Sequence, residues 1–255
     1  MDVREEIDRV KKERNAVILV HNYQIGEVQD MADFIGDSLD LSRKAAETNA
    51  EVIVFCGVHF MAETAAILSP DKTVIMPDTE AGCPMADMIT AEELCEMKAA
   101  HPDATVVTYV NSSAAVKAES DWCCTSANAV SVVAATGADK ILFTPDKYLG
   151  EYIRSLSPGK EFILWNGFCP THAKITAEHI SARRAEHPDA KIIVHPECRP
   201  EVIIGADAVL STSGMVKFSR ESAAREIIVG TETGIIYRLK KENPGKEFYP
   251  LSEEA

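Results

Sequence analysis

One strand-ending pattern recurs three times along this chain at an almost constant interval. An apolar strand runs into polar residues in AVILVHNYQ around His21, in ATVVTYVNS around Tyr109 and in AKIIVHPEC around His195. The second anchor follows the first by 88 residues, and the third follows the second by 86. Self-similarity at a fixed period is typical of chains built from repeated structural units, so we expect three copies of one fold.

A second pattern has the same period. EVIVFCGVHFMAETAAILSPDKTVIMPDTEAGCP (51–84) parallels DKILFTPDKYLGEYIRSLSPGKEFILWNGFCP (139–170), and both end in Cys-Pro. EIIVGTETGIIYRLKKENPGKEFYPLSEEA (226–255) has the same strand, helix, Pro-Gly-Lys turn and strand. The spacing from proline to cysteine is thirteen residues from Pro70 to Cys83 and eleven from Pro158 to Cys169. A similar spacing after Pro244 predicts a third cysteine at Ala255 or just beyond it, so we expect the natural protein to continue past this chain.

Short apolar runs alternate with helical patterns along the chain. The runs occupy residues 16–20, 51–55, 104–110, 140–143 and 191–194. This alternation indicates parallel sheets with crossover helices. With the repeats, it predicts an α/β fold of three units related by a pseudo-threefold axis, each a small parallel sheet flanked by helices, around a central active site. The expected domains are residues 1–84, 85–170 and 171–255. Three similar units with no shared site are the alternative.

Charge and hydropathy exclude several classes of protein. The formal net charge of -14 is opposite to the clustered positive charge that nucleic-acid binding requires. No run of about 18 apolar residues exists, and the first fifteen residues form a charged amphipathic pattern rather than a signal peptide. We therefore expect a cytoplasmic protein with no nucleic-acid or membrane partner. Its seven cysteines are then expected to be thiols, metal ligands or core residues, not disulfides.

Hydroxyl groups recur in the same register as the strands. Ser38, Ser126 and Thr212 each lie seventeen residues after the polar anchor of their copy, and Ser211 adjoins the third. We expect these residues at helix N-termini, where hydroxyls and unpaired backbone N–H groups can bind carboxylate or phosphate oxygens. Three matches in register favour convergence on one site.

Cys83 and Cys169 occupy corresponding loops, each followed by proline. Three thiolates from three such loops would hold one face of a 4Fe-4S cluster and leave the fourth iron open as a Lewis acid. The close CxxC spacing common in zinc sites is absent. The pair therefore predicts an iron-sulfur centre.

Seven motifs in order along nearly the whole chain carry a family resemblance. They are HNYQ (21–24), GDSLDLS (36–42), YVNSS (109–113), TSANA (125–129), CPTH (169–172), HPEC (195–198) and STSGM (211–215). With these motifs the chain resembles the quinolinate synthase family, also called quinolinate synthetase A.

The resemblance implies an enzyme of de novo NAD biosynthesis. Its substrates would be iminoaspartate (iminosuccinate) and dihydroxyacetone phosphate, condensed to quinolinate with loss of phosphate and water. It also implies a 4Fe-4S cluster on three cysteines, of which Cys83 and Cys169 match two and the third has no match here. Cys198 is not a ligand in the family and is expected to be structural. A functional link to L-aspartate oxidase or aspartate dehydrogenase would follow.

The resemblance also supplies site residues. It implies substrate binding at His21, Ser38, Tyr109, Val110, Asn111, Ser126, His195, Glu197 and Thr212. From their places beside these motifs we add His172, Pro196 and Ser211. Among the catalytic candidates, Glu197 is the expected general base, with a pKa that burial should raise toward the working range. Tyr23 and Tyr109 are candidates for proton relay, and His21 and His195 for donation to an anionic substrate.

Other polar residues and cysteines are expected to be structural. We place Asp30 and Asp33 on a solvated helix face and Asp37 in solvent or at a helix cap. Cys123 and Cys124 are expected to begin a helix and pack in the core.

Two other functions remain open at this point. One is a lyase or hydrolase that acts on a small dicarboxylate with a mononuclear metal held by His21, His195 and Glu197. The other is a nucleotide-binding module, against which the absence of GxGxxG and GxxxxGK[ST] argues.

Overall fold

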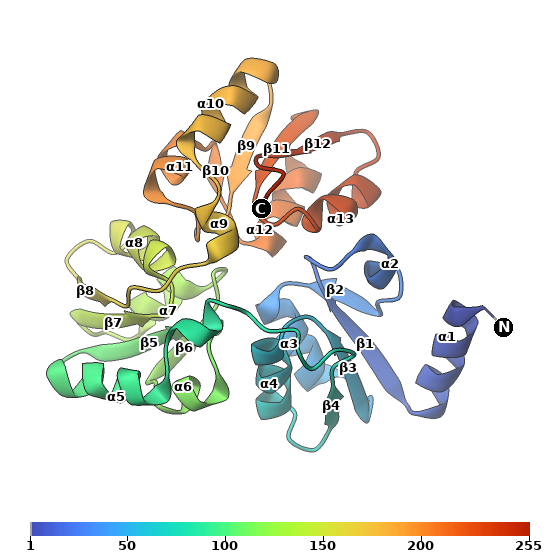
Figure 1. The fold of residues 1–255 in the computed structure, drawn as a ribbon, viewed down its shortest axis with the longest axis horizontal. Helices are drawn as coiled ribbons and strands as arrows, with labels where there is room; N and C mark the ends of the chain where they lie inside the picture. The colour runs from blue at the N-terminus through green and yellow to red at the C-terminus, as the bar shows by residue number, and fades with distance from the viewer. Residues whose placement is uncertain (1) are drawn as a thin grey trace. The chain divides into compact units, whose positions relative to one another are not determined.

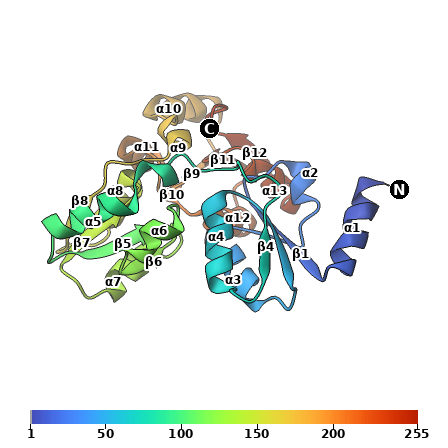
Figure 2. The ribbon, with the colours of Figure 1, turned by 60° about the horizontal axis from the view of Figure 1, so that its bottom comes forward.

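The computed structural model describes residues 2–255, which form two compact units that adjoin in sequence at Cys83 and Pro84. The first unit contains α1 (Val3–Glu13), β1 (Ala16–His21), α2 (Gly26–Gln29), β2 (Phe34–Gly36), α3 (Ser38–Glu47), β3 (Val52–Cys56), α4 (His59–Leu68) and β4 (Thr73–Ile75). Its strands form one sheet in the order β2-β1-β3-β4, and every pair is parallel. Helices α3 and α4 lie side by side (Figures 1 and 2).

The second unit contains two more sheets of the same kind. Its first half comprises η1 (Ala86–Met88), α5 (Ala91–Ala100), β5 (Thr105–Tyr109), α6 (Ala114–Ala118), β6 (Trp122–Cys124), α7 (Ala129–Ala135), β7 (Lys140–Thr144), α8 (Lys147–Ser155) and β8 (Glu161–Leu164). Its second half comprises α9 (Pro170–Ala173), α10 (Ala177–Glu186), β9 (Lys191–Val194), α11 (Pro200–Gly205), β10 (Ala208–Val209), α12 (Thr212–Glu221), β11 (Glu226–Gly230), α13 (Ile235–Glu242) and β12 (Glu247–Pro250). The strand orders are β6-β5-β7-β8 and β10-β9-β11-β12.

The expected α/β fold with three repeated parallel sheets is therefore confirmed. Each central strand is buried, as in the fully covered Ile192–Ile193–Val194 run of β9. The division into three domains stays a prediction, since the second and third sheets belong to one compact unit.

One aspartate in each copy supports the central strand. The carboxylates of Asp33, Asp121 and Asp207 accept the backbone N–H groups of Ile18, Val106 and Ile192 at 2.8, 2.8 and 2.9 Å. Each of these N–H groups belongs to the residue just before the first one that pairs with the neighbouring strand. It has no partner in that strand, and the aspartate side chain accepts it instead. The expectation of a solvated helix face for Asp33 was wrong for this reason.

One lysine in each copy caps a helix. Lys72 donates to Ala45 O at 2.8 Å and Thr48 O at 2.6 Å, at the end of α3. Lys160 donates to Ala138 O beyond α7, and Lys246 donates to Ser219 O and Ser222 O at the end of α12. Lys72 and Lys246 thus satisfy carbonyls that have no partner within their helices, and Lys160 satisfies a carbonyl of the loop after α7.

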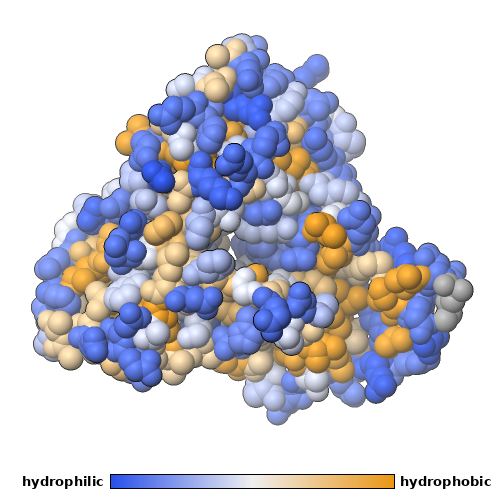
Figure 3. Space-filling view, viewed as in Figure 1, coloured by the Kyte–Doolittle hydropathy of each residue, from blue (hydrophilic) through white to orange (hydrophobic). Residues whose placement is uncertain are grey.

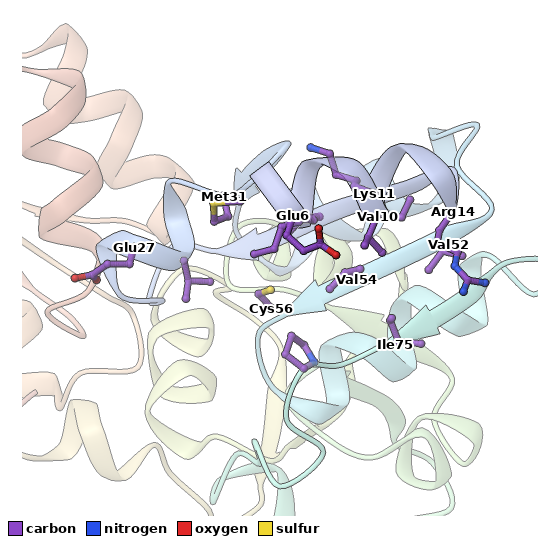
Figure 4. Close-up of a pocket in the computed structure, with 15 residues that line it drawn as sticks. Glu6, Val10, Lys11, Arg14, Glu27, Met31, Val52, Val54, Cys56 and Ile75 are labelled. Carbon is purple, nitrogen blue, oxygen red and sulfur yellow. The ribbon is translucent and has the colours of Figure 1, made fainter. Parts of the chain in front are cut away.

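Helix α1 differs from its counterparts in the other copies. Leu94 of α5 and Ile180 of α10 are buried, whereas no side chain within Val3–Glu13 is buried. Beneath α1 a cavity of about 500 Å³ is lined by apolar side chains of the strands, including Val52, Val54 and Ile75 (Figure 4). Figure 3 shows hydrophobic surface over the part of the first unit next to α1.

Three smaller expectations have clear outcomes. Cys123 and Cys124 lie in strand β6, so the expected helix start was wrong. The expected core packing is confirmed for Cys124, which is buried, and wrong for Cys123, which is exposed. Asp37 is the N-cap of α3 and accepts the N–H groups of Leu39 and Asp40, which confirms the cap. Asp30 terminates the short helix α2. Across residues 2–255, no helix has the length and apolar character needed to span a bilayer.

Candidate active site

Strand ends position the site in the second unit. Tyr109 is the last residue of β5, and His195 directly follows β9. The carboxyl ends of parallel strands are where α/β proteins bind ligands. Glu197 follows His195 in a tight turn in which Cys198 N–H donates to His195 O at 3.0 Å.

Glu197 is the centre of a buried hydrogen-bonded chain. Its side chain is almost fully covered, and its Oε1 accepts the Tyr109 hydroxyl at 2.6 Å. Its Oε2 lies 2.8 Å from His172 Nδ1 and 3.8 Å from His195 Nδ1. Both carboxylate oxygens therefore have partners from other parts of the sequence.

Glu197 and His172 each stabilise the charged form of the other. Burial opposes ionisation of Glu197, but the imidazoles of His195 and His172 outweigh it and lower its pKa to about 2. Burial likewise opposes a charge on His172, yet the Cys169 sulfur and the Glu197 carboxylate raise its pKa well above the usual value. We expected burial to raise the pKa of Glu197, and that was wrong because two imidazoles face one carboxylate.

His172 has a partner at each ring nitrogen. It lies in α9, which begins with Pro170, and its ring stacks on His195 with centroids 4.7 Å apart. Its Nε2 is 2.8 Å from the hydroxyl of Thr231, and its Nδ1 is 3.1 Å from Cys169 Sγ. The ring is thereby fixed between the thiol and the carboxylate.

The two strand-ending histidines share one turn geometry. Glu197 N–H donates to His195 Nδ1 at 3.4 Å, and Tyr23 N–H donates to His21 Nδ1 at 3.3 Å. The neutral ring therefore carries its hydrogen on Nε2. In His195 that nitrogen is 3.2 Å from the hydroxyl of Ser126.

Asp146 anchors the loop that carries Cys169. The carboxylate is fully buried, accepts Cys169 N–H at 3.0 Å and accepts Leu149 N–H at 2.8 Å as the N-cap of α8. Burial and the charge of Glu197 raise the pKa of Asp146 to about 8. Gly167 of the same loop passes so close to Pro145 that a Cβ there would lie 2.5 Å from the Pro145 oxygen.

One backbone hydrogen bond recurs beside each cysteine position. His59 N–H donates to Ala81 O at 2.8 Å, Lys147 N–H to Gly167 O at 2.9 Å, and Thr233 N–H to Ala255 O at 3.3 Å. Cys83 and Cys169 each follow their acceptor by two residues. Both are outside any disulfide and have intermediate exposure. Cys198 is buried in the core of the third copy, which agrees with a structural role.

A cavity of about 290 Å³ opens next to the turn that carries Glu197. It is lined by Ser126 and Asn128 ahead of α7, by Ser211 and Gly214 at α12, and by Pro196. Thr212 is the first residue of α12 and is buried, and Ser211 caps that helix by accepting Gly214 N–H at 3.3 Å. Ser126 lies three residues before Ala129, the first residue of α7, so it is further from a helix than expected.

The remaining predicted residues have defined places. Val110 and Asn111 follow β5, and the buried Oδ1 of Asn111 has no hydrogen-bond partner among the described residues. His21 and Tyr23 contact each other edge to face in the first unit, with ring centroids 4.6 Å apart. Ser38 is the first residue of α3 in that unit.

Sequence reasoning missed Asp146 and Thr231. Both follow the third strand of their sheet, β7 and β11. The sequence could have indicated them, because polar residues stand at the end of this strand in both copies, as TPD (144–146) and GTE (230–232).

Residues 5–255 match the model of the family described as quinolinate synthetase A protein. The chain belongs to this family. It is 60% identical over 250 residues to the quinolinate synthase of Dehalococcoides mccartyi strain CBDB1, covering 98% of this chain and 82% of that protein. It is 58% identical over 249 residues to the quinolinate synthase of Thermodesulfovibrio yellowstonii, with 98% and 82% covered. For the quinolinate synthase of Methanoregula boonei the identity is 54% over 253 residues, with 99% and 83% covered.

Proposed function

We propose that this chain condenses iminoaspartate with dihydroxyacetone phosphate to quinolinate, releasing phosphate and water, in the cytoplasm. Quinolinate synthase activity and a role in NAD biosynthesis follow from membership of the family. The two substrates and the chemistry below are our own inference. The observation that carries them is the buried chain Tyr109–Glu197–His172, which ends at the Cys169 thiol.

Substrate binding would use donors at helix starts and strand ends. An iminoaspartate dianion needs hydrogen-bond donors more than a basic surface. Ser126, Ser211 and Thr212 supply hydroxyls near the 290 Å³ cavity, and His195 supplies its Nε2 hydrogen. The unpartnered Asn111 oxygen is suited to accept an N–H or O–H of the substrate, because a buried acceptor without a partner is costly. His21, Tyr23 and Ser38 of the first unit are proposed substrate ligands on the family resemblance.

The acid and base roles would divide between His172 and Glu197. His172, held as imidazolium by Glu197, donates its proton to a departing hydroxide and releases water. Loss of that charge removes a partner from Glu197 and raises its basicity. Glu197 then takes the hydrogen of the Tyr109 hydroxyl while the Tyr109 oxygen takes a substrate proton. Transfer from Glu197 back to His172 restores the starting state.

The thiols fit the proposed cluster in chemistry and in register. Cys83 and Cys169 are thiols outside any disulfide, and each follows by two residues the backbone acceptor of the same recurring hydrogen bond. A 4Fe-4S cluster bound there would supply an open iron that polarises a substrate oxygen. An aspartate-oxidising enzyme, L-aspartate oxidase or aspartate dehydrogenase, would supply the iminoaspartate.

The test is anaerobic purification of the protein, followed by visible spectroscopy and assay of quinolinate from the two substrates. Cys83→Ser and Cys169→Ser should each lose the iron-sulfur absorption and more than nine-tenths of the activity. Cys95→Ser, which changes an exposed thiol, is the matched control. Undiminished quinolinate formation by Cys169→Ser would overturn the proposal.

A further inference from the structure

Three donor atoms of the candidate active site lie close enough to share one metal ion. Cys169 Sγ, His172 Nδ1 and a Glu197 carboxylate oxygen all lie within 4.8 Å of one another. We propose that the chain, when it carries no cluster, binds one zinc-class divalent cation at Cys169, His172 and Glu197.

The distances suit a tetrahedral ion after a small expansion. His172 Nδ1 is 3.1 Å from Cys169 Sγ and 2.8 Å from Glu197 Oε2. Zinc bonds of about 2.0 to 2.3 Å at tetrahedral angles place ligand atoms about 3.3 to 3.6 Å apart. These two pairs therefore need to open by only about half an ångström, and Cys169 Sγ already lies within 4.8 Å of the Glu197 oxygen.

Each ligand already has the supporting contact that metal ligands usually have. The Thr231 hydroxyl lies 2.8 Å from His172 Nε2, so it can fix the ring with Nδ1 toward the metal. Tyr109 binds Glu197 Oε1 and leaves Oε2 on the side of His172 and Cys169. Asp146 holds the backbone of Cys169 through its N–H.

The ligand chemistry selects the ion. A thiolate, an imidazole and a carboxylate suit Zn²⁺ or Co²⁺ better than Mg²⁺ or Ca²⁺, which prefer oxygen ligands. The thiolate and the carboxylate together match the charge of a divalent cation. Three protein ligands leave the fourth position for water or a small anion, and Cys169 is accessible enough to admit the ion.

One consequence rests on the proposed function. If Cys169 is a cluster ligand, a thiolate bonded to zinc cannot also bond to iron, so zinc and the cluster exclude each other. Zinc would then delay cluster assembly and protect the thiol from oxidation.

The binding test needs no cluster and no activity. The metal-free chain is kept anaerobic with a phosphine reductant and titrated with Co²⁺, whose thiolate charge-transfer absorption reports sulfur ligation. We expect one equivalent of Co²⁺ to bind with this absorption and Zn²⁺ to displace it. Cys169→Ser should lose the absorption. Thr231→Val, which removes one hydroxyl, should weaken binding about tenfold to a hundredfold. Cys95→Ser, which changes an exposed thiol, should behave as the unaltered chain.

Several results would overturn the zinc site: no thiolate absorption, absorption that persists in Cys169→Ser, equal affinity in Thr231→Val, or loss of absorption in Cys95→Ser. Circular dichroism melting curves establish that each variant is folded. A separate arm measures iron uptake by the protein after zinc loading. Undiminished iron uptake with zinc still bound would refute Cys169 as a cluster ligand and leave the zinc site standing.

Discussion

Tyr109 and Glu197 are 88 residues apart in sequence, yet the phenol donates to the carboxylate at 2.6 Å in the interior of the second unit. The bond joins the strand end of one copy to the turn after the strand of the next. A hydrogen bond to a buried charge contributes more than one between neutral groups. This contact therefore links the stability of the unit to its chemistry.

Tyr109→Phe removes only the hydroxyl and should show both effects. We expect about 1 to 3 kcal/mol less stability, because one oxygen of a buried carboxylate loses its donor. The rate of quinolinate formation should fall about tenfold to a hundredfold if the phenol relays a proton. Urea unfolding and a steady-state assay measure the two, with Tyr237→Phe at an exposed site as control. A normal rate in Tyr109→Phe would remove Tyr109 from the relay.

Glu197 should make the protein sensitive to acid. Its folded pKa of about 2 lies below the ordinary value of 4.5, so its contribution to stability is present above about pH 4.5 and is lost as the pH falls toward 2. The difference corresponds to stability on the order of 3 kcal/mol. Glu197→Gln cannot ionise, so its stability should vary less than that of the unaltered chain between pH 5 and pH 2.5. Parallel slopes in urea unfolding across that range would contradict this expectation.

Gly167→Ala should displace the loop that carries Cys169. The new Cβ would lie 2.5 Å from the backbone oxygen of Pro145, which cannot move away as a flexible side chain would. We expect a loss of about 1 to 3 kcal/mol and a lower yield of reconstituted cluster.

Gly82→Ala is the matched control for that change. Gly82 precedes Cys83 in the corresponding loop, and a Cβ there meets nothing closer than Glu80 O at 3.9 Å. Its melting temperature and iron content should match those of the unaltered protein. Equal behaviour of the two alanine variants would show that the close approach at Gly167 is unimportant.

Asp146→Ala should release Cys169. Without the carboxylate, Cys169 N–H loses its acceptor and α8 loses its N-cap. In the metal-free chain we expect Cys169 to be alkylated several times faster by iodoacetamide, relative to the exposed Cys95 as internal reference. Cys124 and Cys198 are buried and should stay protected. Faster reaction of all four thiols would instead indicate general unfolding.

Lys72→Met should destabilise the first unit without a specific effect on the chemistry. The ammonium binds Ala45 O and Thr48 O, so its loss leaves carbonyls at the end of α3 without a donor. We expect about 1 to 3 kcal/mol less stability in thermal or urea unfolding. Lys12→Met, at an exposed position of α1, should be neutral. A neutral Lys72→Met would show that water replaces the ammonium at no cost.

The repeats made most of the fold predictable. The expected strands at 16–20, 140–143 and 191–194 correspond to β1, β7 and β9, because buried strands of parallel sheets are apolar runs at a regular spacing. The strand at Cys123 and Cys124 was missed, because three residues are too few to show a period. Asp33 was misplaced because a carboxylate that binds a strand N–H has no sequence pattern that distinguishes it from a solvated one.

The site was predictable where motifs named its residues. HPEC and CPTH led to His195, Glu197 and His172, which the structure brings into contact. Asp146 and Thr231 lie in loops without a motif, and their partners are distant in sequence. The pKa of Glu197 is low because two nearby imidazoles outweigh the effect of burial. The distances that decide this balance cannot be read from a sequence.

His21 and His195 lie in two turns of the same geometry, and this geometry restricts which ligands each ring can bind. A main-chain hydrogen occupies Nδ1 in both, so the edge of the neutral ring at Nε2 is electropositive by construction. An N–H group at that edge attracts anions and repels cations. The backbone of this negatively charged protein thus orients two histidine rings so that they favour negatively charged ligands.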